Sequence, residues 1–262
     1  MNIVFLGGGR ITSAMLAGLR LAKTKHRLII HDRNGNKLRD LKRRYAAVVE
    51  LDLERAVRRA DLLIIAVRPS SVAELLRSIR ATNKPLLAVS LAAGIPLRIL
   101  SKNLGPPIRW VRAMPSPVCR SGRGLTALTF PRGLAARDRN IVRTLFASFG
   151  QVVEIPESKF DAFTVTYSSS HGYHALAVLA ASAEAVGLDK KTALLASAHA
   201  LADGIVAWRE GKHSLESLLE EAATPGGIAA SAATAMDAAG YKLAVQKGVA
   251  AGLRRARANA RP

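Results

Sequence analysis

The first sixteen residues limit the fold more than any other part of the chain. An apolar run at residues 2–6 meets the glycines Gly7, Gly8 and Gly9, and residues with helical spacing follow at once, up to Leu16. A strand that turns sharply into a helix needs glycine where φ is positive and where the backbone approaches a ligand closely. The helix start then offers N–H groups and a partial positive charge to an anion. We interpret this segment as a dinucleotide-binding turn.

A second apolar run supports this interpretation. Residues 28–31 end at Asp32 and Arg33, about 20 residues beyond the glycines, where a Rossmann strand carries the group that reads the ribose. Gly7-x-Gly9-x-x-Thr12 also matches the motif G-x-G-x-x-G, with Thr in the last position. A tight strand-to-helix turn in some other α/β protein is the alternative.

The residues after the second run bear on the choice of cofactor. An acid such as Asp32 would accept hydrogen bonds from a ribose 2′-OH, whereas an arginine such as Arg33 would pair with a 2′-phosphate. Arg10, Lys37 and Arg39 make the neighbourhood basic. We therefore expect NADP(H) in preference to NAD(H), with NAD(H) as the alternative.

Length and composition narrow the class of protein. A chain of 262 residues suits one large domain or two moderate ones. The longest apolar stretch, residues 174–188, is interrupted by Glu184, and the N-terminus enters a strand without a basic leader. We expect no signal peptide, no membrane span and a cytoplasmic location. Because Cys119 is the only cysteine, no internal disulfide or Cys-rich metal site can form, and we expect no metal.

Positive charge is concentrated in the first half. The formal net charge is +20, and residues 1–154 carry 28 Lys and Arg against 9 Asp and Glu. A domain this basic could bind nucleic acid through phosphate contacts. The arginines are scattered over predicted helices, and only residues 42–44 form a run. We favour a solvated basic face that attracts an anionic cofactor and substrate, and we do not expect nucleic acid as a partner.

Strands and helices alternate through the first 155 residues. Amphipathic stretches at residues 72–79 and 138–149 lie between apolar runs, and Gly150 is expected to close the last helix. This order predicts an α/β fold with a Rossmann-type doubly wound sheet and parallel strands. Further strands are expected at residues 48–51, 62–67, 85–91 and 108–112, followed by a hairpin-like pair at 125–130 and 152–155.

Residues 156–262 have a different texture. Ala- and Leu-rich segments with few turn signals predict an all-helical second domain. Small residues on several helix faces favour burial against other helices or a second subunit, so we expect a dimerisation domain and a homodimer. The expected helical segments are residues 161–188, 190–209, 215–223 and 226–260.

Two sets of loops are candidates for binding. In an open α/β sheet the ligand lies beyond the carboxyl ends of the strands. The loops that follow the expected strands are residues 7–12, 32–33, 67–69, 90–94 and 113–117. In the helical half, Thr224-Pro225-Gly226-Gly227 precedes a long helix and could present N–H groups to a carboxylate. An ordinary interhelical turn with Thr224 as the N-cap is equally consistent with that sequence.

Six motifs in order resemble the pyrroline-5-carboxylate reductase family nearly from end to end. They are the glycine turn at 6–12, Ala66-Val67-Arg68-Pro69, Ser90-Leu-Ala-Ala-Gly94, Arg112-Ala-Met-Pro115, Tyr173 and Thr224-Pro225-Gly226-Gly227. The resemblance implies NAD(P)H-dependent reduction of a cyclic imine to L-proline. It also implies a dimer, or a higher assembly of dimers, built by the helical domain.

The resemblance also implies roles for particular residues. The substrate, a small anionic imino acid, would bind through its carboxylate to Thr224, Pro225, Gly226, Gly227, Ile228 and Ala229. The cofactor would lie on Leu6, Gly7, Gly8, Gly9, Arg10, Ile11, Ala66, Val67, Arg68, Pro69, Leu91, Ala92 and Ala93.

The chain departs from the family pattern on the substrate side. The family's loop usually reads Ser-Pro-Gly-Gly-Thr-Thr, and its last Thr hydroxyl contacts the ring nitrogen, whereas this chain has Ile228 and Ala229. Residues 114–117 are one residue shorter than Met-Pro-Asn-Thr-Pro, and residues 167–173 place His171 at a remodelled position. His171 is a candidate proton donor or carboxylate partner, with a surface or packing histidine as the alternative. Another cyclic imino acid as substrate, and a weakened relative that only binds nucleotide, are the alternative functions.

Overall fold

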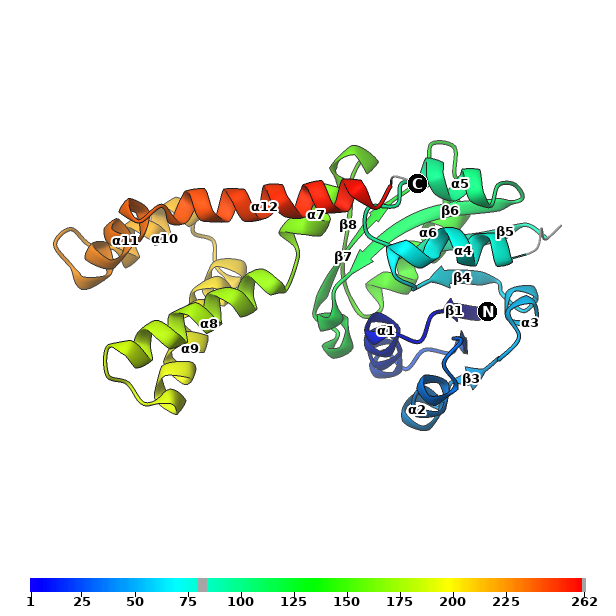
Figure 1. The fold of residues 1–262 in the computed structure, drawn as a ribbon, viewed down its shortest axis with the longest axis horizontal. Helices are drawn as coiled ribbons and strands as arrows, with labels where there is room; N and C mark the ends of the chain where they lie inside the picture. Colours follow the sequence, from blue (N-terminus) through cyan, green and yellow to red (C-terminus); the bar gives the residue numbers. More distant parts are fainter. Residues whose placement is uncertain (80–83, 261–262) are drawn as a thin grey trace. The chain divides into compact units, whose positions relative to one another are not determined.

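The computed structural model describes residues 1–79 and 84–260 (Figure 1). The chain divides into two compact units. The first, called here the sheet unit, runs from Met1 to Tyr167 and takes in the chain again from Ala251 onward. The second, the helical unit, spans Ser168–Ala250. Each unit is described by itself.

The sheet unit is built on one eight-stranded sheet in the described part of the chain, with strand order β3-β2-β1-β4-β5-β6-β7-β8. The first six strands pair in parallel, in the order of a dinucleotide-binding doubly wound sheet, and this confirms the predicted fold class. The strands are β1 Asn2–Leu6, β2 Arg27–His31, β3 Val48–Val49, β4 Leu62–Ile65, β5 Leu86–Ser90, β6 Ile108–Pro115, β7 Gly124–Thr129 and β8 Gly150–Glu154.

Helices cover both faces of this sheet. In β1, Ile3 and Phe5 point into one apolar cluster while Val4 and Leu6 point into another, because successive side chains of a strand alternate between faces. The helices α1 Arg10–Leu21, α2 Gly35–Tyr45 and α6 Ala136–Ala147 contribute to the first cluster. The helices α3 Leu53–Arg58, α4 Pro69–Ser78 and α5 Leu97–Asn103 contribute to the second.

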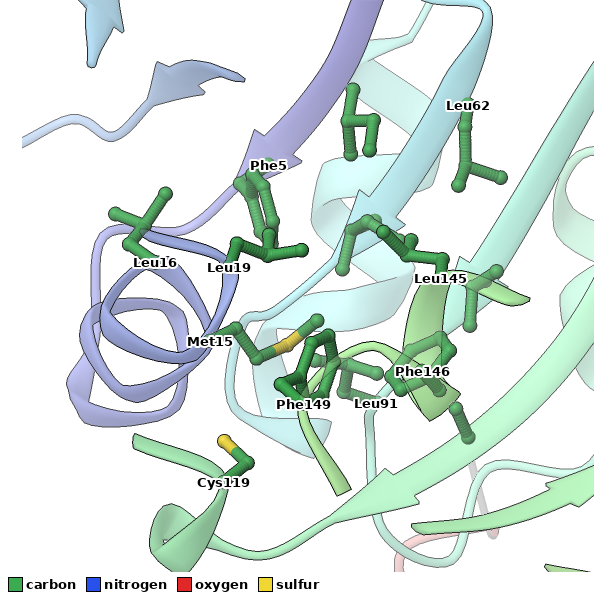
Figure 2. Close-up of a cluster of buried hydrophobic side chains, with 14 of the residues drawn as sticks. Phe5, Met15, Leu16, Leu19, Leu62, Leu91, Cys119, Leu145, Phe146 and Phe149 are labelled. Carbon is green, nitrogen blue, oxygen red and sulfur yellow. The ribbon is translucent and has the colours of Figure 1, made fainter. Parts of the chain in front are cut away.

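The first cluster is the larger of the two and includes side chains of β1 and α1, the two elements that flank the glycine turn (Figure 2). Phe5 of β1 and Met15 of α1 are fully buried there. Phe146 and Phe149 stack edge to face with ring centroids 5.5 Å apart. Cys119, in the short 3-10 helix η1 Pro117–Ser121, is buried at its rim, and burial raises the pKa of its thiol to about 11. The buried side chains of α1 therefore hold this helix closely against the sheet.

The expected hairpin of the last two strands is wrong. β7 and β8 pair in parallel, with α6 as the crossover between them, because parallel neighbours need a long connection. The antiparallel pair is β6 with β7, which are joined by the short η1 segment. The antiparallel junction of the described sheet therefore lies between β6 and β7, one strand earlier than expected.

Gly150 does not close a helix. α6 ends at Ala147 with Ser148 as its C-cap, and Gly150 opens β8. A Cβ at Gly150 would lie 2.1 Å from the carbonyl oxygen of Gly124, so glycine is needed for two strand backbones to meet.

The second half is helical, as predicted. Residues 161–188 and 226–260 are each interrupted, at residues 167–169 and at Gly240, whose φ is +87°. Within the helical unit, α8 packs against α9. The helices are α7 Glu157–Thr166, α8 Ser170–Ala185, α9 Lys190–Glu210, α10 Leu215–Ala222, α11 Ile228–Ala238 and α12 Tyr241–Ala258. None of the helices in the described residues has the length and apolarity that crossing a membrane requires.

Candidate active site

The predicted cofactor residues lie along one edge of the sheet unit. They follow β1, β2, β4 and β5, which are adjacent in the sheet, so their carboxyl ends form one continuous border. Hydrogen bonds join the neighbouring loops: Gly7 N–H donates to His31 O at 2.8 Å, and Ala66 N–H to Leu6 O at 2.8 Å. Leu91 N–H donates to Ile65 O at 3.0 Å. The fold thus brings all four segments together.

The glycine turn has the geometry that its sequence predicts. Gly7 has a φ of +111°, and a Cβ there would lie 2.6 Å from the carbonyl oxygen of Ala66. Thr12 Oγ1 donates to Gly7 O at 2.5 Å and closes the turn. At Gly9, the N-cap of α1, an added Cβ would meet no described atom within 4 Å.

The start of α1 is open to an anion. No side chain in the described residues caps this helix, and its first turn holds no acidic residue. The N–H groups of the first turn, which bear the partial positive charge of the helix N-terminus, are therefore free to bind a ligand beside Gly9. A pyrophosphate group fits this arrangement, since it needs main-chain donors and close access to the backbone.

Asp32 fastens the glycine turn to the end of β2. Its Oδ2 accepts the N–H of Gly8 at 2.7 Å, and its Oδ1 accepts the N–H of Asn34 at 2.8 Å. Asn34 in turn caps α2 by accepting from Asn36 and Lys37 N–H. Each carboxylate oxygen keeps a second lone pair for a ribose hydroxyl. Asp32 thus lies at the end of β2, as predicted, and its hydrogen bond to Gly8 also fixes the glycine turn.

Arg33 lies at the outer end of the same border. Its Nη1 is 2.9 Å from Glu74 Oε1 of α4, and both side chains are exposed. A surface pair of this kind contributes about 1 kcal/mol or less. The guanidinium can therefore turn toward a phosphate at little cost, and Lys37, whose Nζ lies 3.9 Å from Asp32 Oδ2, adds a second positive charge.

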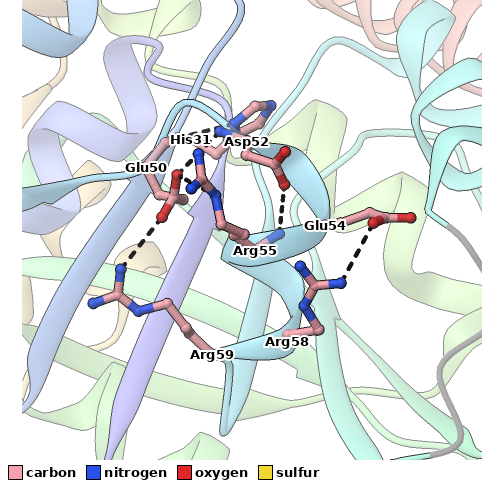
Figure 3. Close-up of polar contacts among 7 residues, drawn as sticks. All are labelled: His31, Glu50, Asp52, Glu54, Arg55, Arg58 and Arg59. Atoms are coloured by element: carbon pink, nitrogen blue, oxygen red, sulfur yellow. Dashed lines mark hydrogen bonds and ion pairs between the residues drawn. The ribbon is translucent and has the colours of Figure 1, made fainter.

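A polar network supports the end of β2 from the side of α3 (Figure 3). His31 Nδ1 lies 3.0 Å from the carbonyl oxygen of Glu50. The Glu50 carboxylate pairs with Arg55 at 3.5 Å and Arg59 at 3.4 Å. Asp52 caps α3 by accepting the N–H of Arg55 at 2.7 Å, and this hydrogen bond holds the pKa of Asp52 below its ordinary value. Part of the positive charge in this half is therefore paired locally.

The loop after β5 is held by residues that sequence reasoning missed. Asn259 Nδ2 donates to the carbonyl oxygen of Ala93 at 3.1 Å, and Glu157 Oε1 accepts the N–H of Leu97 at 2.6 Å. These partners are 166 and 60 residues apart in the chain. No pattern in the sequence signals either contact.

The predicted substrate residues lie in the helical unit, in the turn before α11 and in the first two residues of that helix. Gly226 has a φ of +78°, and Gly227 N–H donates to Thr224 O at 2.9 Å. Gly227, with no side-chain cap among the described residues, is the N-cap of α11. Thr224 is therefore not the N-cap, although the segment does form the turn between α10 and α11. The first N–H groups of α11 are open to a carboxylate, and Ile228 beside them is 92% exposed.

Comparison with known families gives one match in each half of the chain. Residues 2–94 match the family model described as NADP oxidoreductase, coenzyme F420-dependent. Residues 157–259, called here the dimerisation segment, match the model described as pyrroline-5-carboxylate reductase dimerisation. The pyrroline-5-carboxylate reductase of Synechocystis sp. is 26% identical over 260 residues, which cover 97% of this chain and 97% of that protein. The chain is thus similar to pyrroline-5-carboxylate reductases along nearly its whole length.

Solved structures of the family share the fold. The 1-pyrroline-5-carboxylate reductase of Streptococcus pyogenes matches with a TM-score of 0.90 at 24% identity over 98% of each chain. The Plasmodium falciparum pyrroline carboxylate reductase with NADP bound matches with a TM-score of 0.89 at 20% identity, over 100% of this chain and 98% of that one.

The departures from the family's pattern can now be placed. Ile228 and Ala229 stand at the start of α11, and His171 lies on the exposed first turn of α8, with its main-chain N–H donating to Ser168 O at 3.1 Å. These residues all belong to the helical unit. The glycine turn and the loops after β4 and β5 resemble the family's motifs. The shortened segment at residues 114–117 is a further departure, and it lies at the end of β6 in the sheet unit.

Proposed function

We propose that this chain is a member of the pyrroline-5-carboxylate reductase family and reduces 1-pyrroline-5-carboxylate to L-proline with NADPH. The observation that carries the proposal is the open N-terminus of α1, framed by Gly7 and Gly9, in a chain whose relatives of this name match along nearly its whole length. The reaction needs a hydride at the C=N carbon and a proton on the nitrogen. The reduced nicotinamide supplies the hydride when bound.

The chain's own residues bind and orient the reactants. In this proposal the first turn of α1 binds the pyrophosphate, while Asp32 and Arg33 contact the adenosine ribose and its 2′-phosphate. The Ala66–Pro69 and Leu91–Ala93 loops support the rest of the cofactor. The first N–H groups of α11, at residues 228 and 229, bind the substrate carboxylate. Because hydride transfer to an iminium needs mainly proximity and a dry pocket, these binding groups suffice for the hydride step, and only the proton remains to be supplied.

A coupled assay tests the proposal. Purified protein is mixed with NADPH and pyrroline-5-carboxylate, and the absorbance of the reduced nicotinamide is followed while proline is quantified. We expect proline to appear in a one-to-one ratio to the NADPH consumed. NADPH binding without turnover of this or any related imine would instead support the nucleotide-binding relative.

A different cyclic imino acid is the second candidate substrate. Ile228 and Ala229 carry no hydroxyl, so the polar contact expected near the ring nitrogen is absent at these two positions. A larger or less polar ring would suit the exposed Ile228 better. The same assay run with six-membered cyclic imino acids distinguishes the two, through the ratio of their kcat/KM values.

Arg33 is the residue that should set the preference for NADPH. We expect Arg33→Ala to raise the KM for NADPH about tenfold, because a charge-assisted hydrogen bond to the 2′-phosphate is lost. The KM for NADH should change less than about twofold by the same reasoning. Arg43→Ala is the matched control, since Arg43 pairs with Asp40 on α2 at 3.1 Å. Equal effects on the two cofactors would show that Arg33 does not contact the 2′-phosphate.

His171 is proposed as the proton donor to the product nitrogen. If so, His171→Ala should lower kcat and remove one limb of the pH–rate profile, because the group that donates the proton is lost. His174→Ala, on the same exposed turn of α8, is the control. An unchanged profile in His171→Ala would assign the proton to water.

We also propose a homodimer that works in the cytoplasm. Most of the large apolar side chains that are exposed in the described residues lie in the helical unit, among them Val186, Leu195 and Leu219. Such side chains favour burial against a second copy. We retain residues 1–155 as the dinucleotide-binding domain and residues 156–262 as the dimerisation and substrate domain.

A further inference from the structure

The segment between β5 and α5 is held at its middle by the C-terminal end of the chain. Asn259 Nδ2 donates to the carbonyl oxygen of Ala93 at 3.1 Å. The next residue, Gly94, has a φ of +75°, and a Cβ there would lie 2.0 Å from the carbonyl oxygen of Ala256. The backbone at the end of α12 therefore contacts the loop directly, and only glycine permits this approach.

The same segment is held at its end by α7. The N–H of Leu97, at the start of α5, donates to Glu157 Oε1 at 2.6 Å. Glu157 is itself fixed by Arg112, whose Nη1 lies 3.5 Å away and whose side chain is 1% exposed. Residues 93–97 thus lie between two hydrogen bonds from distant parts of the chain, one at Ala93 and one at Leu97.

The two anchors stand at the two ends of the dimerisation segment. That segment begins at residue 157 and ends at residue 259. Ala93, the acceptor of the Asn259 amide, belongs to the loop proposed to support the cofactor. A main-chain carbonyl in a loop has no strand or helix partner, so a side-chain donor decides how it is oriented.

We propose that Asn259 is a positioning residue for the cofactor. Its amide orients the peptide after Ala93 and so holds residues 91–93 in the shape that receives NADPH, while Glu157 fixes the far end of the same loop. The inference rests on the proposed function, because it takes residues 91–93 as part of the cofactor site. It assigns to the last turn of the chain a role in cofactor affinity.

The test compares NADPH binding by the full-length protein and two variants. Asn259→Asp keeps the shape of the side chain but points an acceptor at the Ala93 carbonyl. Asn103→Ala is the matched control, since Asn103 Nδ2 also donates to a main-chain carbonyl, that of Ile99 at 2.8 Å, away from residues 91–93. We expect Asn259→Asp to raise the Kd and KM for NADPH about tenfold, with kcat at saturating NADPH within about twofold of wild type. The control should bind like wild type.

A second measurement keeps the inference testable without turnover. Amide hydrogen exchange at residues 91–94 of the unliganded protein should be faster in Asn259→Asp than in wild type. If Asn259→Asp does not fold, Asn259→Ala and Asn259→Gln take its place, with the Kd raised in the first and largely restored in the second, which keeps the donor.

The outcomes separate the two proposals. A wild-type protein that does not bind NADPH would overturn the proposed function. A wild-type protein that binds NADPH, with a Kd and exchange rates unchanged by loss of the Asn259 amide, would overturn the positioning role alone. A general loss of kcat and thermal stability with the Kd unchanged would also count against it, since that is what a purely structural contact would give.

Discussion

Replacing Gly9 by valine should abolish NADPH binding at working concentrations while leaving the protein folded. The backbone at Gly9 has a φ of −80° and a ψ of −171°, which any residue can adopt, and an added Cβ meets no described atom within 4 Å. The new side chain would instead fill the space in front of the α1 N-terminus. We expect the Kd for NADPH to rise at least about a hundredfold, which corresponds to about 2.7 kcal/mol. Titration of cofactor fluorescence measures it.

Gly7 provides the contrasting variant. Its φ of +111° is unfavourable for alanine, and the new Cβ would lie 2.6 Å from Ala66 O and 3.2 Å from Val67 Cγ1. Gly7→Ala should therefore destabilise the fold itself by about 3 kcal/mol or more. Thermal melting distinguishes the two substitutions. Wild-type affinity in Gly9→Val would exclude the α1 N-terminus as the phosphate site.

Replacing Arg112 by methionine should cause a large loss of stability. Arg112 is 1% exposed, pairs with Asp161 at 2.9 Å and Glu157 at 3.5 Å, and stacks over the Phe160 ring at 4.3 Å. Its removal leaves two carboxylates side by side without their counter-charge. Because both carboxylates are partly exposed, we expect a loss of about 3 kcal/mol, at the lower end for a buried pair.

Urea unfolding measures this effect, with Arg43→Met as the control. Arg43 pairs with Asp40 at the surface, so its replacement should change the free energy of unfolding by less than about 0.5 kcal/mol. Equal midpoints for the two variants would show that the Arg112 cluster adds no net stability. Since Glu157 also holds Leu97 N–H, Arg112→Met should in addition raise the KM for NADPH.

The positive charges of the first half fall into two groups. Arg55 and Arg59 pair with Glu50, and Arg58 pairs with Glu54. Arg33 and Lys37, by contrast, lie at the border where the loops after β1 and β2 meet. This distribution favours attraction of an anionic cofactor to that border.

The sequence by itself determined the parts of this protein that depend on near neighbours. The β1–glycine turn–α1 unit follows from an apolar run and from the positive φ of Gly7. The helical second half follows from its composition and spacing, and the Pro-Gly-Gly turn before α11 from local backbone preferences. These patterns extend over a few residues, so they can be recognised in the sequence without knowledge of the tertiary structure.

Only the tertiary structure decided the rest. The antiparallel direction of β7 depends on which strand the chain reaches after η1, and the sequence misled us there because the apolar patterns of parallel and antiparallel strands are alike. The Asp32 clamp on Gly8, the Arg112 ion pairs and the Asn259 contact each join residues at least 24 positions apart. Such contacts carry no local signal, because a donor and its acceptor are selected by the path of the backbone between them.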